Sequence, residues 1–314
     1  MNTYSDLEHF PYPFKGEIYR YSNNSMPLDP PSSIEVSNKY KQEVKLKRDL
    51  LTHHPERCYH SLSHTLDAQW EALALVMDNM ATYFPEKFTL HKCEDEWVFH
   101  NKMVDEKVTF IFGDGATLPC EPLDFIGKHV QEDLILMVQK DGELYLDAGQ
   151  LCFPGNWSLA FNLGMCFKDL HHPIPGFNEK GLDDRIRQFI LRLEEGSPWG
   201  RLNWQMQAGD RLDTSLETFD EWGKERKLVT SENAGEIVHL RVEVQKLFRL
   251  PRSETILFTI HTHLLSLEMF ATNKQWAKQF AGILEELPPF IYEYKGLSLY
   301  REAVIDYLNR RVSE

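Results

Sequence analysis

The first part of the chain has the apolar spacing of helices. Charged and apolar residues alternate with helical periodicity over 38–51, and over 61–84 large apolar residues such as Leu66 and Trp70 recur every three or four positions. Residues 1–38 contain five prolines and few helix-forming residues. We therefore expect an extended arm that lies on the core, followed by two helices.

Period-two alternation, typical of strands, appears after residue 85. We expect strands over 96–100, 107–115, 134–139, 143–153, 240–248 and 256–264. The turn Lys140-Asp141-Gly142 predicts that the third and fourth of these strands form a hairpin. Leu240 and Val242 alternate with polar residues, so the strand 240–248 has one apolar and one polar face.

The remaining patterned segments are helical. We expect a short helix within 124–133, another within 156–164 that is capped by Asn156, an amphipathic helix over 181–195, and helices from residue 268 to the end. Strands and helices in this order predict an α+β fold, in which an antiparallel sheet of about five or more strands lies between N- and C-terminal helices.

The charge limits the classes of partner. The chain has 34 Lys and Arg against 48 Asp and Glu, a formal net charge of −14, and no basic tract. Such a surface repels phosphate backbones and anionic lipids, so nucleic acid and membranes are not expected partners, whereas cations or basic proteins fit. The five cysteines form no CxxC pair, and the N-terminus does not resemble a signal peptide. We expect a soluble, cytoplasmic protein; the sequence does not indicate its oligomeric state.

Histidines are the most informative residues, because the chain has 13 of them. His60 and His64 lie four residues apart on a predicted helix, but no third metal ligand is near them in sequence. His171 and His172 lie in DLHHPIPG, where two prolines and a glycine stiffen the backbone. A histidine held on a stiff backbone suits a metal or haem ligand, although a capped loop explains the motif as well.

The predicted hairpin near the C-terminal end of the chain offers a second candidate site. We expect three to six polar side chains on one of its faces, from Arg241, Glu243 and Gln245 opposite Thr259, His261 and His263. A solvated outer face explains this pattern equally well, but two imidazoles among charges of both signs favour a functional surface.

Other enzyme classes lack their sequence motifs. The chain has no GxSxG nucleophile elbow, no P-loop and no GxGxxG after a strand. A Cys–His nucleophile stays open, with Cys152 and Cys166 as the nearest thiols to the predicted helix 156–164. Cys152 lies in an apolar run, where a buried, unreactive thiol is the usual outcome.

Several motifs in order resemble those of the haem-dependent oxidative N-demethylase family. They are PYPFKGEIYR, VQEDLILM, LCFPGNWSLAFNLG, HHPIPG, GRLNWQ and LRVEVQKLFRLPRSETILFTI. The resemblance runs from about Pro11 to Leu308. It implies a PAS-like antiparallel sheet that binds haem b, and an enzyme that uses dioxygen to remove a methyl group from a small secondary amine. It also implies electrons from a separate flavin/iron–sulfur reductase.

The resemblance further implies a domain plan and an iron ligand. Residues 1–95 would form the arm and helices, 96–268 the PAS-like haem-binding core and 269–314 the C-terminal helices, all in one compact unit. The family motif IHxPVPG corresponds to LHHPIPG in this chain, which makes His171 the expected axial ligand of the haem iron. The chain departs from the family pattern at Val244, where an arginine is expected, and at His261 and His263, where an arginine and a tyrosine are expected.

Further roles follow as expectations. We expect Arg201 and Arg241 to pair with haem propionates, because a guanidinium matches a carboxylate in bidentate geometry. Glu243 is a candidate to bind a protonated amine, and His261 to deliver protons. The full set of candidates is catalytic His261, Glu243 and Thr259, and cofactor-binding His171, Arg201, Trp204, Arg241 and His263.

Two alternative functions remain at this level. PAS-like folds often serve as sensors, so a haem-binding sensor or gas-binding module without turnover is the main alternative. The altered residues on the hairpin also fit an oxygenase that acts on a larger amine or an amino acid.

Overall fold

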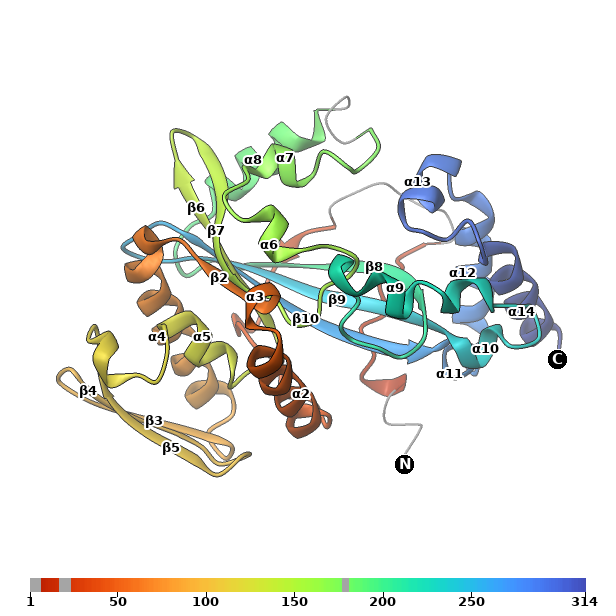
Figure 1. Cartoon of the computed structure of the whole chain (residues 1–314). Helices are drawn as coiled ribbons and strands as arrows, with labels where there is room; N and C mark the ends of the chain where they lie inside the picture. The colour runs from red at the N-terminus through yellow and green to blue at the C-terminus, as the bar shows by residue number, and fades with distance from the viewer. Residues whose placement is uncertain (1–6, 17–23, 177–180) are drawn as a thin grey trace.

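The computed structural model of the chain describes residues 7–16, 24–176 and 181–314. Its large sheet consists of β1 (Met26–Pro27), β2 (Tyr59–Ser61), β6 (Asp133–Lys140), β7 (Glu143–Gln150), β8 (Trp199–Ala208), β9 (Val238–Arg249) and β10 (Ile256–Ser266). These strands are ordered β1-β8-β9-β10-β6-β7-β2, and every neighbouring pair is antiparallel (Figure 1). The predicted α+β class with a large antiparallel sheet is therefore confirmed.

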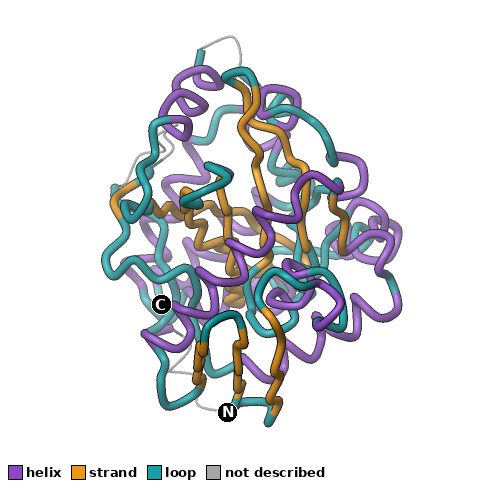
Figure 2. The backbone as a smooth tube through the Cα atoms, turned by 90° about the vertical axis from the view of Figure 1, so that its left-hand side faces the viewer, coloured by secondary structure: helices purple, strands orange, loops and turns teal. Residues whose placement is uncertain are grey.

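A small antiparallel sheet lies apart from the large one (Figure 2). It consists of β3 (Phe88–Cys93), β4 (Glu96–Asn101) and β5 (Glu106–Ile111). The predicted strands 96–100 and 107–115 correspond to β4 and β5. The expected domain boundary at residue 95 falls in the turn between β3 and β4, two strands that pair along their length.

The helices occupy both sides of the large sheet (Figure 1). The longer ones are α2 (Tyr40–His53), α4 (Leu66–Tyr83), α8 (Leu182–Leu191), α12 (Lys274–Glu286) and α14 (Arg301–Ser313). The shorter ones are α3 (Pro55–Cys58), α5 (Pro122–Gly127), α6 (Leu159–Asn162), α7 (Phe167–Leu170), α9 (Phe219–Trp222), α10 (Ala234–Ile237), α11 (Leu267–Phe270) and α13 (Pro289–Tyr294). Single 3₁₀ turns are η1 (Ser63–Thr65), η2 (Gly115–Thr117), η3 (Leu216–Thr218) and η4 (Glu225–Lys227). None of the described helices is long and apolar enough to cross a membrane.

The register of β9 and β10 divides the sheet into two chemically different faces. Glu243 pairs with Thr262, and Val244 pairs with His261. Directly paired residues of antiparallel strands share a face. We call the face that carries Glu243 face A and the face that carries His261 face B.

Face A is apolar toward β6 and β7, where α6, α7 and α8 cover it. The hydrophobic side chains at this interface come from both layers, and include Ile135, Leu146, Ile260, Leu159, Phe167 and Ile190. Toward β8 and β9 the same face is polar. The apolar part of face A therefore fixes the position of α7 and of the loop that follows it.

Face B is covered in two parts. The helices α4 and α5, together with the small sheet, pack on β6, β7 and the ends of β9 and β10. The C-terminal helices pack on the other half of face B, where Leu240, Val242 and Leu265 meet α12 and α14. The sheet is thus the central layer between two sets of helices, but the expected arrangement is wrong: the N-terminal helix α4 and the C-terminal helices cover the same face, and α6, α7 and α8 cover the other.

The predicted N-terminal arm lies against the C-terminal helices. Tyr12 stacks on Trp276 of α12 with 4.3 Å between ring centroids, and Phe14 stacks on Phe280 at 5.0 Å. Further along the arm, residues 32–37 run between β1 and α2 against face B, where the Ser33 carbonyl accepts a hydrogen bond from Thr259. The arm therefore joins the two helical layers that cover face B.

Three local predictions are wrong. His60 lies on the short strand β2 and His64 in the 3₁₀ turn η1, so the two do not share a helix face. The helix expected within 156–164 is capped by Ser158, which accepts a hydrogen bond from the Phe161 amide, and not by Asn156. The third error is an omission: the strand β8 was missed, although Leu202, Trp204, Met206 and Ala208 alternate with polar residues.

Candidate functional site

A strip of polar side chains crosses face A on β8 and β9. The pairs across the two strands are Arg201 with Gln245, Asn203 with Glu243, and Gln205 with Arg241. We call these six residues the polar strip. Three of them, Asn203, Gln205 and Gln245, carry side-chain amides that can donate or accept hydrogen bonds. The strip therefore surrounds one carboxylate with hydrogen-bond donors.

Arg241 is the most deeply buried residue of the polar strip. Its side chain is fully buried, and its three nitrogens together donate to five acceptors, the carbonyls of Leu212 and Phe153 and the side chains of Gln207, Thr262 and Glu243. Burial lowers the pKa of this guanidinium, and the carboxylate of Glu243 opposes that shift. Because its donors are taken, the geometry does not support the expected pairing of Arg241 with a haem propionate. Its visible role is to hold Glu243.

Glu243 is the acidic centre of the strip. One carboxylate oxygen lies 3.4 Å from Arg241 Nε, and the other accepts hydrogen bonds from Gln245 at 2.9 Å and Asn203 at 3.2 Å. The residue is 7% exposed. A buried carboxylate held by one arginine and two amides is a fixed negative charge that can receive a cationic group.

A close approach of backbone encloses the strip. Gly155, in the loop after β7, pairs with Thr214 as an isolated bridge. A Cβ atom built on Gly155 would lie 2.8 Å from Glu243 Oε1 and closer still to the Gln205 amide. Only glycine lets this loop contact the polar strip so closely. The loop 151–156 therefore packs against Glu243.

Lys295 is a cation that sequence reasoning missed. It follows α13 at the outer edge of β8, where Nζ donates to the Trp204 carbonyl at 2.6 Å and lies 4.4 Å from the Trp204 ring centroid. Burial and the charge of Arg201 lower the pKa of Lys295 to about 8, while Glu243 opposes the shift. No motif signals this residue, because it comes to β8 from a segment 91 residues further along the chain than Trp204.

His171 follows α7 on the side of face A. Its Nδ1 donates a hydrogen bond to the Phe167 carbonyl at 2.8 Å, and its ring lies 4.2 Å from the Phe167 ring. Burial lowers the pKa of His171 to about 4, and the charge of Arg201 adds to this effect. The imidazole is therefore neutral near pH 7, and with its proton on Nδ1 its Nε2 is the nitrogen that carries a lone pair.

A surface cavity lies beside this part of face A. It has a volume of about 680 Å³ and is bounded by α8 on one side and by the residues that lead into β8 on the other. Phe189 and Trp199 meet in its wall, edge to face, with 5.0 Å between ring centroids. Trp199, which lines the cavity, lies two residues before Arg201 on β8.

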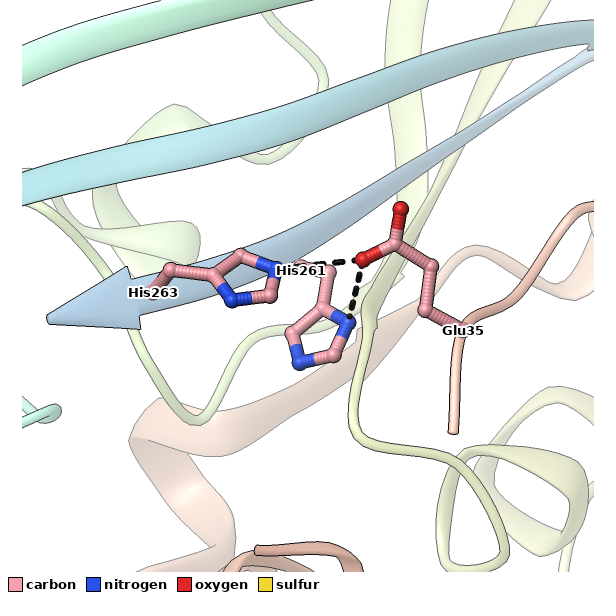
Figure 3. A group of neighbouring side chains, drawn as sticks. All are labelled: Glu35, His261 and His263. Carbon is pink, nitrogen blue, oxygen red and sulfur yellow. Dashed lines mark hydrogen bonds and ion pairs between the residues drawn. The ribbon is translucent and has the colours of Figure 1, made fainter. Parts of the chain in front are cut away.

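The other predicted site residues lie on face B. His261 is buried beside three carboxylates: Nδ1 is 3.2 Å from Glu35 and 3.3 Å from Glu132, and Nε2 is 3.8 Å from Glu43. His263 Nε2 lies 3.1 Å from Glu35, and its ring stacks on that of His261 at 4.3 Å (Figure 3). Sequence reasoning missed these glutamates because all three come from segments far from β10.

The carboxylates set the charge state of this group. Burial alone would lower the pKa of His261, but Glu132, Glu35 and Glu43 outweigh it and raise the pKa well above its usual value. Burial and the charge of His261 lower the pKa of His263. Burial also opposes ionisation of Glu35, yet its two imidazole neighbours hold its pKa far below the usual range.

The expectation of one shared polar face is therefore wrong. The connection 250–255 pairs odd-numbered residues of β9 with even-numbered residues of β10, so His261 is opposite Val244 and His263 is opposite Val242. Trp204 also points to face B, where it contacts Phe280. The structure brings Arg201, Arg241 and Glu243 together on face A. It places Thr259, Trp204, His261 and His263 on the opposite side of the sheet.

The comparison with protein families agrees with the motifs described above. The family model for haem-dependent oxidative N-demethylase, alpha subunit-like proteins matches residues 24–305. This match includes every strand of the large sheet, the loop with His171 and the polar strip. The chain belongs to the haem-dependent oxidative N-demethylase, alpha subunit-like family.

Proposed function

We propose that this protein is a haem-dependent oxygenase that removes a methyl group from a small amine, using dioxygen and electrons from a separate flavin/iron–sulfur reductase. Family membership supports the class of reaction. The structural observation that carries the proposal is the side chain of His171, a neutral imidazole whose Nδ1 is fixed by the Phe167 carbonyl.

The described residues fit a haem group. A haem-ligating histidine is typically held by a hydrogen bond from Nδ1 to a carbonyl or carboxylate, which orients the ring and leaves Nε2 for the metal. Nδ1 of His171 donates such a hydrogen bond to the Phe167 carbonyl. Arg201, whose charge acts on His171, is the guanidinium best placed to pair with a propionate. When bound, haem b supplies the binding of dioxygen and the oxidation of the substrate methyl group.

The polar strip provides the complement for an amine. Glu243 presents a fixed carboxylate, Arg241 holds that carboxylate from beneath, and Asn203 donates to it from the side. A protonated small amine can take the place of an amide donor at Glu243 and form a charge-assisted hydrogen bond to its carboxylate. Glu243 is the proposed substrate-binding residue. Thr259, His261, Trp204 and His263 are left out of the proposed catalytic set because they lie on face B.

The visible spectrum of the purified protein tests the cofactor and its ligand. We expect a Soret band in the wild type, and its loss or a marked shift in His171→Ala. The matched control is His172→Ala, because His172 is the exposed neighbour in the same motif. A His171→Ala protein with an unchanged Soret band would disprove the ligand assignment.

Turnover separates an oxygenase from a sensor. With an electron donor and a methylated amine, the proposal expects amine-dependent oxygen consumption and release of formaldehyde. Replacing Glu243 by Gln keeps its size and should raise KM for the amine at least tenfold while the Soret band stays. A stable oxygenated protein that consumes no electrons with any methylated amine would instead establish the sensor function.

A further inference from the structure

The group on face B has the composition of a metal site. We call Glu35, Glu43, Glu132, His261 and His263 the glutamate–histidine cluster. The two histidines project from β10, and the glutamates come from three other segments: the arm, α2 and the residues just before β6. The cluster lies on the opposite side of the sheet from the polar strip, so it is independent of the proposed function.

Three of its ligand atoms surround one point. Glu35 Oε2 lies 3.2 Å from His261 Nδ1 and 3.1 Å from His263 Nε2, and these three atoms all lie within 4.8 Å of one another (Figure 3). A tetrahedral ion about 2.0–2.1 Å from each ligand holds its ligand atoms about 3.3 Å apart. Both contacts of Glu35 Oε2 already have nearly this separation, and the two imidazole nitrogens complete the set of ligand atoms. The stacked imidazoles already direct both nitrogens toward the same carboxylate oxygen.

Two buried polar atoms of the cluster lack hydrogen-bond partners. His261 is 2% exposed and Glu132 is fully buried. Within the part of the chain that the structure describes, His261 Nδ1 and Glu132 Oε2 are buried without a hydrogen bond. The contacts of His261 Nδ1 with Glu35 and Glu132 lack hydrogen-bond geometry, and unsatisfied buried polar atoms are rare in native proteins. Coordination of Nδ1 and charge compensation of Glu132 would account for both atoms.

The charges of the cluster call for a divalent cation. Glu35, Glu43 and Glu132 contribute three negative charges, and Lys246 Nζ, 3.6 Å from Glu35, contributes one positive charge. A divalent ion bound by neutral imidazoles makes the sum zero. If His261 were protonated and no ion were bound, the cluster and Lys246 would together keep one uncompensated negative charge in a largely buried place.

We propose that Glu35, His261 and His263 bind a divalent first-row transition-metal ion. Two imidazoles and a carboxylate suit such ions, whereas Mg²⁺ and Ca²⁺ prefer oxygen ligands. Glu132 neutralises the ion from the buried side, and the Glu43 carboxylate lies 3.8 Å from His261 Nε2, where carboxylates behind metal-binding histidines are found. The side chains of Glu35 and His263 are 35% and 19% exposed, which gives the ion a path from solvent.

The bound ion would fasten the arm to the centre of the sheet. Glu35 and His263 are 228 residues apart in sequence, and the ion would link the segment before α2 to β10. The hydrogen bond from Thr259 to the Ser33 carbonyl already holds this segment at one point. The site is therefore structural, and the loss of the ion should loosen residues 32–37.

The first experiment measures the metal in the whole, haem-containing protein. We expect titration of chelator-treated protein with Zn²⁺ to show one saturable site per chain, and Mg²⁺ to show none. X-ray absorption at the zinc edge should report two imidazoles and oxygen ligands near 2.0 Å. A wild type with no saturable Zn²⁺ site, or a zinc shell without imidazole, would overturn the proposal even if no variant folds.

Variants then locate the ion. His263→Gln and Glu35→Gln keep the size and polarity of each side chain and should each weaken Zn²⁺ affinity at least tenfold. His239→Gln is the matched control, because His239 lies on the adjacent strand β9 but on face A. The Soret band should be unchanged in all three, which separates this test from that of the haem ligand. Equal Zn²⁺ affinity in wild type and His263→Gln would refute the site.

Discussion

Individual histidines of this protein differ by their surroundings and not by their sequence motifs. His171 is neutral because burial and a nearby arginine lower its pKa, and its Nδ1 donates to the Phe167 carbonyl. His261 has three carboxylates around it, so any cation, a proton or a metal, is stabilised there. The same side chain therefore serves opposite electrostatic purposes on the two faces of one sheet.

At the residue scale, Gly155 tests the polar strip. A Gly155→Ala methyl group would displace the ends of the Gln205 and Glu243 side chains, which can move without changing the backbone. We expect a change in the free energy of unfolding of less than about 1 kcal/mol, but an increased KM for the amine of at least fivefold. Urea denaturation and steady-state kinetics measure the two effects.

The control for this substitution is Gly115→Ala. Gly115 begins the turn η2, has an ordinary backbone conformation and has open space where a Cβ would lie. It should leave both stability and KM unchanged. An unchanged KM in Gly155→Ala would mean that substrate does not contact this part of the strip.

At the scale of elements, the C-terminal helices depend on local signals and on the arm. The helix α12 is capped by Asn273, whose side chain accepts hydrogen bonds from the amides of Gln275 at 3.1 Å and Trp276 at 3.2 Å. Its apolar side then receives Tyr12 and Phe14 of the arm. The cap and the aromatic contacts therefore act on the same first turns of one helix.

Removal of this cap should destabilise the protein measurably. We expect Asn273→Ala to lower the free energy of unfolding by about 1 kcal/mol, because two amides at the helix start lose their acceptor. Asn273→Asp keeps the acceptor and should stay within about 0.5 kcal/mol of the wild type. Chemical denaturation of the three proteins gives the comparison. Equal stability of the Ala and Asp variants would show that the cap contributes nothing.

At the scale of the whole molecule, His129 joins the small sheet to the large one. Its ring packs between Phe99 of β4 and Phe125 of α5, at 5.3 and 5.0 Å. Its Nδ1 accepts from Asn101 and from Arg48 of α2. Since both partners are donors, the ring must be neutral, and burial together with the charge of Arg48 lowers the pKa of His129 to about 3.

This histidine predicts a loss of stability in acid. The pKa of His129 is about 3 in the folded state and about 6.5 when unfolded, so between these values only the unfolded state binds the proton. The contribution of His129 is complete above pH 6.5 and decreases as the pH falls toward 3. The slope reaches about 1.4 kcal/mol per pH unit for this one group.

The comparison with His129→Asn isolates the effect from other titrating groups. Asparagine does not titrate, so the stability difference between wild type and variant should shrink as the pH is lowered from 7 to 5. Urea denaturation at several pH values measures this difference. A difference that does not change with pH would show that His129 is not the neutral, buried group described.

The elements with strong local patterns could be predicted. The helices α2 and α4, the hairpin of β6 and β7 and the strands β9 and β10 all follow from apolar spacing and from the turn at Gly142. The strand β8 has the same kind of pattern, because Leu202, Trp204 and Met206 alternate with polar residues, so the sequence contains a signal for it that the predicted set of strands omits. Its place in the sheet comes from pairing with β9.

The alternation of each strand is a property of the sequence alone, because side chains project to opposite sides at a period of two. Which residues of two strands share a face depends on register, and a shift of one residue reverses it. The connection 250–255 and packing on both faces set that register. For this reason the sequence identified His171, Glu243 and His261 as candidates, but only the tertiary structure placed them on opposite sides of one sheet.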